Sequence, residues 1–160
     1  MGKLAQRQIV AEIQPSAVTG GHNRGPAFNG YFAQVSGGEI TASVEKVYDG
    51  GSKFPETLCA PSEIGDITVT RFFDPEVDGA ALKVLRGMVG QVYYNINVFD
   101  LDCGLRVYGT ERVYPNALLI GLTEPEGDSA SGAPAVFSLT FGISEVSGQT
   151  VAGRIRPTGA

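Results

Sequence analysis

The chain has 160 residues, a mass of 16.8 kDa, a net charge of −5 and a pI near 4.8. That length predicts a single domain over 1–160, which can bury about two-thirds of its surface without a disulfide or metal to hold it together. Glycine contributes 22 residues, and charged residues make up 18% of the chain, against a usual value of about 25%. This composition excludes disorder driven by charge and a long coiled coil, and it favours a β protein rich in turns.

The hydropathy and charge patterns also exclude several kinds of partner. No apolar run approaches the roughly 18 residues of a membrane span, and the first ten residues lack the apolar run of a signal peptide. The 12 basic residues are scattered singly, whereas a nucleic-acid-binding surface needs a basic cluster. Neither a membrane nor specific nucleic-acid binding is expected, although an acidic surface past which DNA can slide would fit.

Alternation of apolar and polar residues predicts strands along most of the chain. The expected strands are 7–14, a hairpin within 31–51 that turns at Gly37 and Gly38, 66–73, 92–102, two strands within 104–125, 135–144 and a short strand within 149–157. The segment at about 49–65 contains several glycines and prolines without alternation, which predicts a long loop.

One segment follows the helical period instead. Asp74 and Pro75 suit the N-cap and first turn of a helix over about 75–89, and Gly90 suits its C-terminal cap. One apolar stripe contains Ala81, Leu82, Leu85, Met88 and Val89. The expected fold is mainly β, an antiparallel β-sandwich or partial barrel with one flanking α-helix.

The sequence lacks the residues that most catalytic sites need. His22 is the only histidine and is expected to be a solvated loop residue. Cys59 and Cys103 are too few for a zinc site, and we expect them to be reduced and packed, with one disulfide as the alternative. The carboxylate pairs in FDLD (99–102) and EPEG (124–127) could form a hydrolase dyad or a calcium site, but such pairs are usually solvated. We therefore expect no catalytic residues, no cofactor and no metal.

Two predicted strands carry uncharged polar residues opposite their apolar face. Strand 91–99 presents Tyr93, Asn95 and Asn97 there, and strand 135–144 presents small residues such as Ser138 and Thr140. The side chains of strand 91–99 that face the core are Val92, Tyr94, Ile96 and Val98. An ordinary exposed sheet face carries Lys, Glu and Arg. The uncharged rows indicate a face that meets another copy or lines a passage, with an ordinary exposed face as the alternative.

The order of these features resembles that of the major tail tube proteins of long-tailed bacteriophages. In 37–90, a strand ITASVEKVYDGG leads into a long loop with PE, then GDITVTRFFDP, then a short helix ending in RGMVG. The later LLIGLTEPEGDSASGAPAVFSLTFGI is similar to the last hairpin of that family. The resemblance covers roughly residues 37–145, about two-thirds of the chain.

The resemblance implies a structural virion protein whose copies form hexameric rings that stack into a tail tube. It implies further tail proteins as partners, namely a terminator, a tape measure protein and a baseplate, with DNA passing through the lumen during ejection without specific binding. Such a protein is made in the host cytoplasm, becomes part of the phage tail and has no enzymatic activity.

Within such a tube, we expect Tyr93, Asn95 and Asn97 to face the lumen, because a DNA conduit favours a wall without basic side chains. We expect the loop to contact the adjacent ring, because a long structureless loop in a compact domain usually has a function. Its contact residues are expected to be Asp49, Gly50, Gly51, Ser52, Lys53, Phe54, Pro55 and Glu56.

Three alternatives compete with a phage tail tube protein. The inner tube proteins of bacterial contractile secretion systems share the same architecture. A carbohydrate-binding β-sandwich module would belong to another class, but such modules present Trp or Tyr platforms, and this chain has no Trp and 6 Tyr. A small jelly-roll enzyme would need histidines that the chain lacks.

Overall fold

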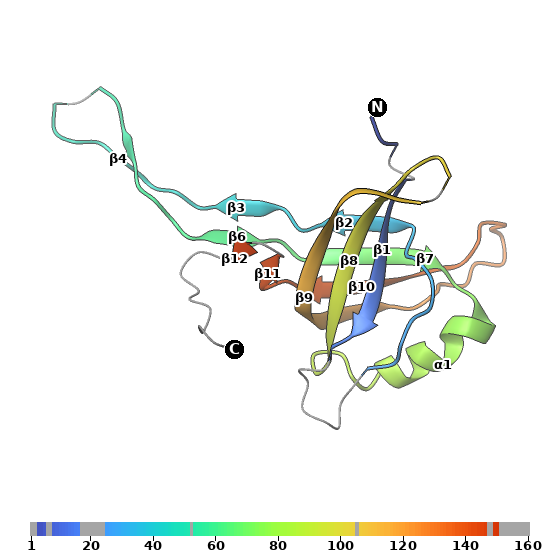
Figure 1. The fold of residues 1–160 in the computed structure, drawn as a ribbon. Helices are drawn as coiled ribbons and strands as arrows, with labels where there is room; N and C mark the ends of the chain where they lie inside the picture. Colours follow the sequence, from blue (N-terminus) through green and yellow to red (C-terminus); the bar gives the residue numbers. More distant parts are fainter. Residues whose placement is uncertain are drawn as a thin grey trace, which may run out of the picture.

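The computed structural model describes residues 3–5, 8–16, 25–51, 53–104, 106–146 and 149–150. Its centre is a six-stranded antiparallel sheet that curls into a half-barrel (Figure 1). In sheet order the strands are β1 (Ile9–Pro15), β8 (Tyr93–Leu101), β9 (Val107–Thr123), β10 (Val136–Gly142), β7 (Ile67–Phe72) and β2 (Gln34–Gly37). The curl brings the two ends of the sheet together, since Ala11 and Phe32 exchange backbone hydrogen bonds of 3.0 and 2.7 Å. The predicted fold class, mainly β with one helix, is confirmed.

The core lies on the inner face of this curled sheet. The even-numbered residues predicted to face inward are all buried, both in β8 and at Val92 just before it, with Tyr94 and Ile96 fully inaccessible. Phe137, Leu139 and Phe141 of β10 are likewise fully buried, as the alternation in that strand predicts. Period-2 patterning therefore assigned the two faces of these strands correctly.

Helix α1 (Pro75–Leu85) covers one end of the half-barrel (Figure 1). It begins as predicted, because the Asp74 side chain accepts a hydrogen bond of 3.0 Å from the backbone N–H of Glu76. Its buried face contains Ala81, Leu82 and Leu85. The helix was predicted to extend to about residue 89, but it ends at Leu85 and is followed by turns whose hydrogen bonds join residues three apart. Met88 and Val89 still pack on the core from this turn segment.

The largest departure from the sequence prediction is a two-stranded arm, defined here as residues 38–66. β3 (Ile40–Ala42) pairs with β6 (Ser62–Ile64), and β4 (Lys46–Val47) pairs with β5 (Glu56–Thr57). The predicted hairpin turn at Gly37 and Gly38 is wrong, because β2 pairs with β7 rather than with β3. The predicted loop at 49–65 is the tip and the returning half of the arm. Its short strands were missed because they are held by cross-strand pairing rather than by local alternation.

Gly37 permits the close backbone approach at the base of the arm. Its φ is +91°, and a Cβ at this position would lie 1.9 Å from the backbone oxygen of Asp66 on the opposite strand. Only glycine permits that conformation and that approach. The two glycines therefore form a bend between β2 and β3, where the body of the protein meets the arm.

Two further elements differ in detail from the prediction. The two strands expected within 104–125 are one 17-residue strand, β9, which is bent where its register with β8 shifts. Asn116 lies in this region with a φ of +53°. The final predicted strand begins with β12 (Gln149–Thr150), paired to β11 (Glu145–Val146), and its remainder lies outside the described residues. Among the described residues no helix is long and apolar enough to cross a membrane.

A buried ion pair joins α1 to the sheet. The guanidinium of Arg71 on β7 is hydrogen-bonded to the carboxylate of Asp78 on α1, and the two side chains are 10% and 2% exposed. The same guanidinium donates to the backbone oxygen of Asn29 at 2.6 Å and lies 4.6 Å from the centroid of the Phe32 ring. It therefore links a strand, the helix and the segment that precedes β2.

Candidate functional site

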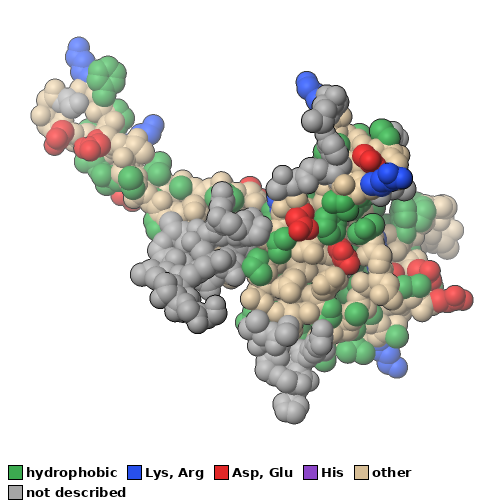
Figure 2. All heavy atoms as spheres, in the orientation of Figure 1, with side chains coloured by type: hydrophobic (Ala, Val, Ile, Leu, Met, Phe, Trp, Pro, Cys, Tyr) green, Lys and Arg blue, Asp and Glu red, His purple; other side chains and the backbone are tan. Residues whose placement is uncertain are grey.

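The arm projects from the half-barrel as a separate ribbon (Figure 1). It exposes six large hydrophobic side chains, between 45% and 82% accessible, and Figure 2 shows hydrophobic groups along its length. These residues are Ile40, Val44, Val47, Tyr48, Phe54 and Leu58. A two-stranded ribbon that exposes so much apolar surface is poorly stable in water. The arm is therefore a candidate interaction surface.

Most of the net negative charge of the chain also lies in the arm. Six carboxylates and two lysines lie within residues 38–66, which gives −4 of the chain's net −5. The remainder of the sequence carries 11 acidic and 10 basic residues, a net charge of −1. Apolar contacts and positive groups on a partner would complement this surface.

The structure places seven of the eight residues predicted for inter-ring contact at or beside the tip of the arm. Lys53, Phe54 and Glu56 are exposed there, together with Asp49. Gly51 has a φ of +92° in the turn. Pro55 is half-buried and Gly50 is exposed, while Ser52 lies outside the described residues.

The three residues predicted to face a lumen are half-buried on the outer face of β8. Tyr93, Asn95 and Asn97 alternate with core residues, as predicted. Asn95, however, has a structural partner, because its Oδ1 accepts a hydrogen bond of 3.0 Å from the backbone N–H of Asn116. Asn95 thus stabilises the bend of β9, which the sequence alone did not indicate.

A second uncharged surface lies on the outer face of β2, β7, β10 and β9. Strand register aligns Gln34, Thr70, Ser138 and Thr123 in one row, and Ser36, Thr68, Thr140 and Gly121 in the next. The hydroxyl oxygens of Thr70 and Ser138 are 2.8 Å apart, and those of Thr68 and Thr140 are 3.3 Å apart. We call these two rows the hydroxyl face. The outward residues of β10 were identified from sequence, but their alignment with three other strands depends on long-range pairing.

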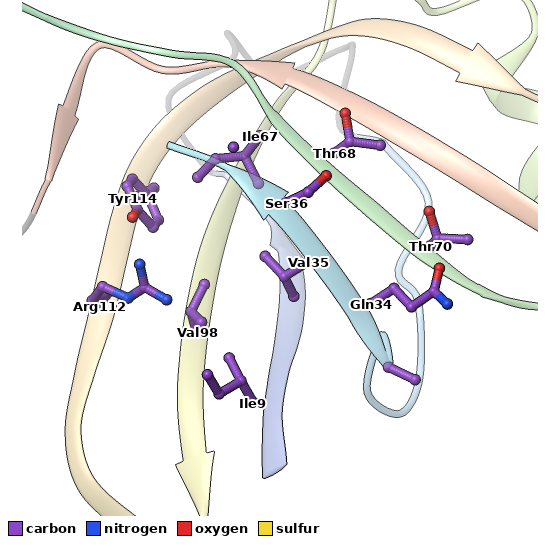
Figure 3. Close-up of a pocket in the computed structure, with 12 residues that line it drawn as sticks. Ile9, Gln34, Val35, Ser36, Ile67, Thr68, Thr70, Val98, Arg112 and Tyr114 are labelled. Atoms are coloured by element: carbon purple, nitrogen blue, oxygen red, sulfur yellow. The ribbon is translucent and has the colours of Figure 1, made fainter. Parts of the chain in front are cut away.

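A hollow of about 680 Å³ lies where β1 and β2 diverge (Figure 3). Ile9, Val35, Val98 and Tyr114 line it, and Gln34, Ser36, Thr68 and Thr70 of the hydroxyl face also border it. The guanidinium of Arg112 points toward it from β9. Sequence analysis missed this hollow because its residues come from five strands that are distant along the chain.

The remaining candidates from the sequence have structural roles or are exposed. The carboxylate of Asp102 accepts backbone hydrogen bonds of 2.9 Å from Gly104 and Arg106 in the turn between β8 and β9. Glu124 forms an exposed ion pair with Arg86. These contacts favour a structural or solvated role for Asp102 and Glu124 over a hydrolase dyad or a calcium site.

The two cysteines are free and exposed, so they are not packed in the core as expected. His22 lies outside the described residues. No group of three potential metal ligands occurs in the part of the chain that the structure describes. Burial raises the pKa of Tyr94, whose hydroxyl donates a hydrogen bond of 2.8 Å to the backbone oxygen of Pro26. This hydroxyl belongs to the core rather than to a reactive site.

Comparison with known proteins relates the fold to contractile injection systems. No protein-family pattern matches the chain, and no curated protein is similar to it in sequence. A chain of the PVC sheath–tube complex of an extracellular contractile injection system superimposes with a TM-score of 0.67 at 19% identity, covering 90% of this chain and 89% of that chain. A chain of the anti-feeding prophage baseplate, solved with 6-fold symmetry, gives 0.68 at 16% identity, covering 91% and 95%.

A more distant likeness links the fold to an Hcp protein. That crystal structure gives a TM-score of 0.50 at 10% identity, covering 86% of this chain and 90% of that chain. The chain thus has the fold found in tube assemblies of contractile injection systems. At these identities the likeness establishes the fold.

Proposed function

We propose that this protein is a structural tube subunit whose copies form hexameric rings that stack into a tube. The observation that carries this proposal is the arm, which holds six exposed large hydrophobic side chains away from the body of its own chain. The fold similarity to injection-system chains supports it, and the six-fold symmetry of one of those assemblies supports rings of six.

The inner tube of a contractile apparatus is the form best supported by the comparisons. A phage major tail tube protein, which the sequence pattern resembles, has the same architecture and remains part of the proposal. Either protein works with cap or terminator and baseplate components, acts inside an assembled particle and catalyses no reaction. A DNA cargo, and a tape measure protein as partner, apply to the phage form.

The assembly can be tested by shortening the arm. Residues 46–57 are replaced by Asn-Gly, so that Glu45 and Leu58, which are already hydrogen-bonded at 2.9 Å, flank a two-residue turn. We expect unchanged far-UV circular dichroism but no tubes by negative-stain electron microscopy. A matched control shortens the exposed loop 126–133 between β9 and β10 and should still form tubes.

Two outcomes would contradict the proposal. Tubes formed at the normal rate by the shortened arm would show that the arm is only a connector. A wild-type chain that stays monomeric at every concentration, and binds glycans, would instead identify a carbohydrate-binding module.

The channel wall is the second part of the proposal. Sequence analysis predicts Tyr93, Asn95 and Asn97 there, and we add the part of the hydroxyl face on β9 and β10, which does not border the hollow, as a second candidate. Its side chains are uncharged and partly satisfy one another, so they offer no cationic contact to a passing polyanion. Both surfaces lie on the outer face of the same sheet, one on β8 and the other beginning on its neighbour β9.

Cysteine accessibility separates the two candidate walls. Thr140→Cys and Asn97→Cys are made in a chain that also carries Cys59→Ser and Cys103→Ser, leaving Asn95 intact. In assembled tubes, a channel residue should react with a small maleimide but not with a 5-kDa polyethylene glycol maleimide, which is too large to enter. A residue on the outer surface reacts with both reagents, and one buried between subunits reacts with neither. We expect the channel pattern at position 140.

A further inference from the structure

The hollow between β1 and β2 is an unfilled part of the barrel. Beyond the contact between Ala11 and Phe32 the two strands separate, and Ile9 and Val35 face each other across the opening (Figure 3). The inner-facing residues Val98 and Tyr114 form apolar walls deeper in the hollow. The full hollow, which Gln34, Ser36, Thr68 and Thr70 also border, has a volume of about 680 Å³ and is large enough for an aromatic side chain and part of its flanking backbone.

The hollow has one positive group. Arg112 is the only charged residue among those that line it, and its guanidinium points toward the opening (Figure 3). Neither of the two ion pairs found in the described residues involves Arg112. An occupant should therefore combine an apolar or aromatic group with a carboxylate next to it.

The arm tip has this combination. Tyr48 is 67% exposed and is followed directly by Asp49, which is also exposed. The arm as a whole has a net charge of −4, which complements Arg112. Tyrosine suits such a position because it supplies a large rigid apolar surface at a low entropic cost.

The arm does not reach the hollow of its own chain. It leaves the body at Gly37, which lines the hollow, and extends away from it (Figure 1). Eleven extended residues at roughly 3.3 Å each place Tyr48 about 36 Å from Gly37. A contact between tip and hollow must therefore join two copies, and because the surfaces differ, it repeats head to tail and either closes a ring or continues as an open assembly.

We propose that the hollow between β1 and β2 receives Tyr48 and Asp49 from the arm of a second copy of this chain. The Tyr48 ring packs between Ile9 and Val35, and the Asp49 carboxylate pairs with Arg112. The proposal rests on the proposed tube function and names the surface that the arm contacts in the neighbouring subunit.

Disulfide capture tests this contact directly. In a chain with Cys59→Ser and Cys103→Ser, Tyr48→Cys is combined with Ser36→Cys, at an exposed residue where the hydroxyl face borders the hollow. Mild oxidation of assembled tubes should produce covalent ladders on a non-reducing gel. The matched control combines Tyr48→Cys with Val84→Cys, which is 49% exposed on the helix away from the hollow, and should give no ladder.

Charge exchange provides a second, independent test. Arg112→Glu and Asp49→Arg should each raise the concentration needed for assembly roughly tenfold, equivalent to about 1.4 kcal/mol. The double variant should restore assembly, because the ion pair is re-formed with reversed polarity. Far-UV circular dichroism of each variant confirms that the fold is intact.

The outcomes separate the two proposals. In one outcome, tubes form normally, give no ladder when Tyr48→Cys is combined with Ser36→Cys, and show no rescue by the double charge exchange. That result overturns the hollow as the docking site and leaves the tube function standing. A wild-type chain that never assembles overturns the tube function itself.

Discussion

Replacing Asp78 by Asn tests whether the buried ion pair holds the helix on the sheet. The substitution keeps the shape of the side chain but removes the charge that compensates Arg71, whose side chain is only 10% exposed. Removing one member of a buried pair costs about 3–5 kcal/mol, because the other charge stays buried without a counter-charge. We expect about 3 kcal/mol, since asparagine can still accept a hydrogen bond.

The assay is urea unfolding followed by far-UV circular dichroism at a protein concentration below that of assembly. With an m-value near 2 kcal/mol/M, a loss of about 3 kcal/mol lowers the midpoint by about 1.5 M. Glu124→Gln is the matched control, because the Arg86–Glu124 pair is 62% and 41% exposed. An exposed pair contributes at most about 1 kcal/mol, so its midpoint should fall by less than about 0.5 M.

A double variant distinguishes charge compensation from simple packing. Arg71→Met with Asp78→Leu removes both charges and keeps apolar volume beside the three phenylalanine rings that surround the guanidinium. We expect its stability to return to within about 1 kcal/mol of the wild type. Equal midpoints for Asp78→Asn and Glu124→Gln would refute the reasoning, and so would a double variant less stable than Asp78→Asn.

Three further predictions follow from the core. Leu85→Asp should prevent soluble folding, because a carboxylate at this fully buried position costs several kcal/mol; a soluble, tube-forming variant would disprove the placement of the helix. Gly25→Ala should lower the melting temperature, because the added Cβ would lie 2.3 Å from the Tyr94 hydroxyl oxygen, while Gly127→Ala, with open space around it, should not. The raised pKa of Tyr94 means that the folded state disfavours its ionisation. Stability should therefore be complete below the normal tyrosine pKa of about 10 and fall above it, and a Tyr94→Phe variant should show a weaker alkaline loss.

Local sequence patterns determined the strands and the helix of the body. In β8 and β10 the two-residue alternation assigned each side chain to the correct face, because one face of the sheet is buried and a shift of one residue would expose the core. Asp74, followed by proline, marked the start of the helix through its own capping hydrogen bond. These signals act within a few residues of one another, so they can be read without knowing the fold.

The tertiary structure alone decided how those elements meet. The sequence placed a turn at Gly37 and Gly38, but the competing pairing of β2 with β7, some 30 residues later, turns that segment into the base of an arm. The hydroxyl face, the hollow and the Arg71–Asp78 pair likewise join residues from separate strands and the helix. Their positions depend on strand order and register, which are set by the burial of the whole core rather than by any local pattern. The surfaces proposed for assembly arise from that long-range pairing, whereas the absence of a basic cluster was already evident in the residues themselves.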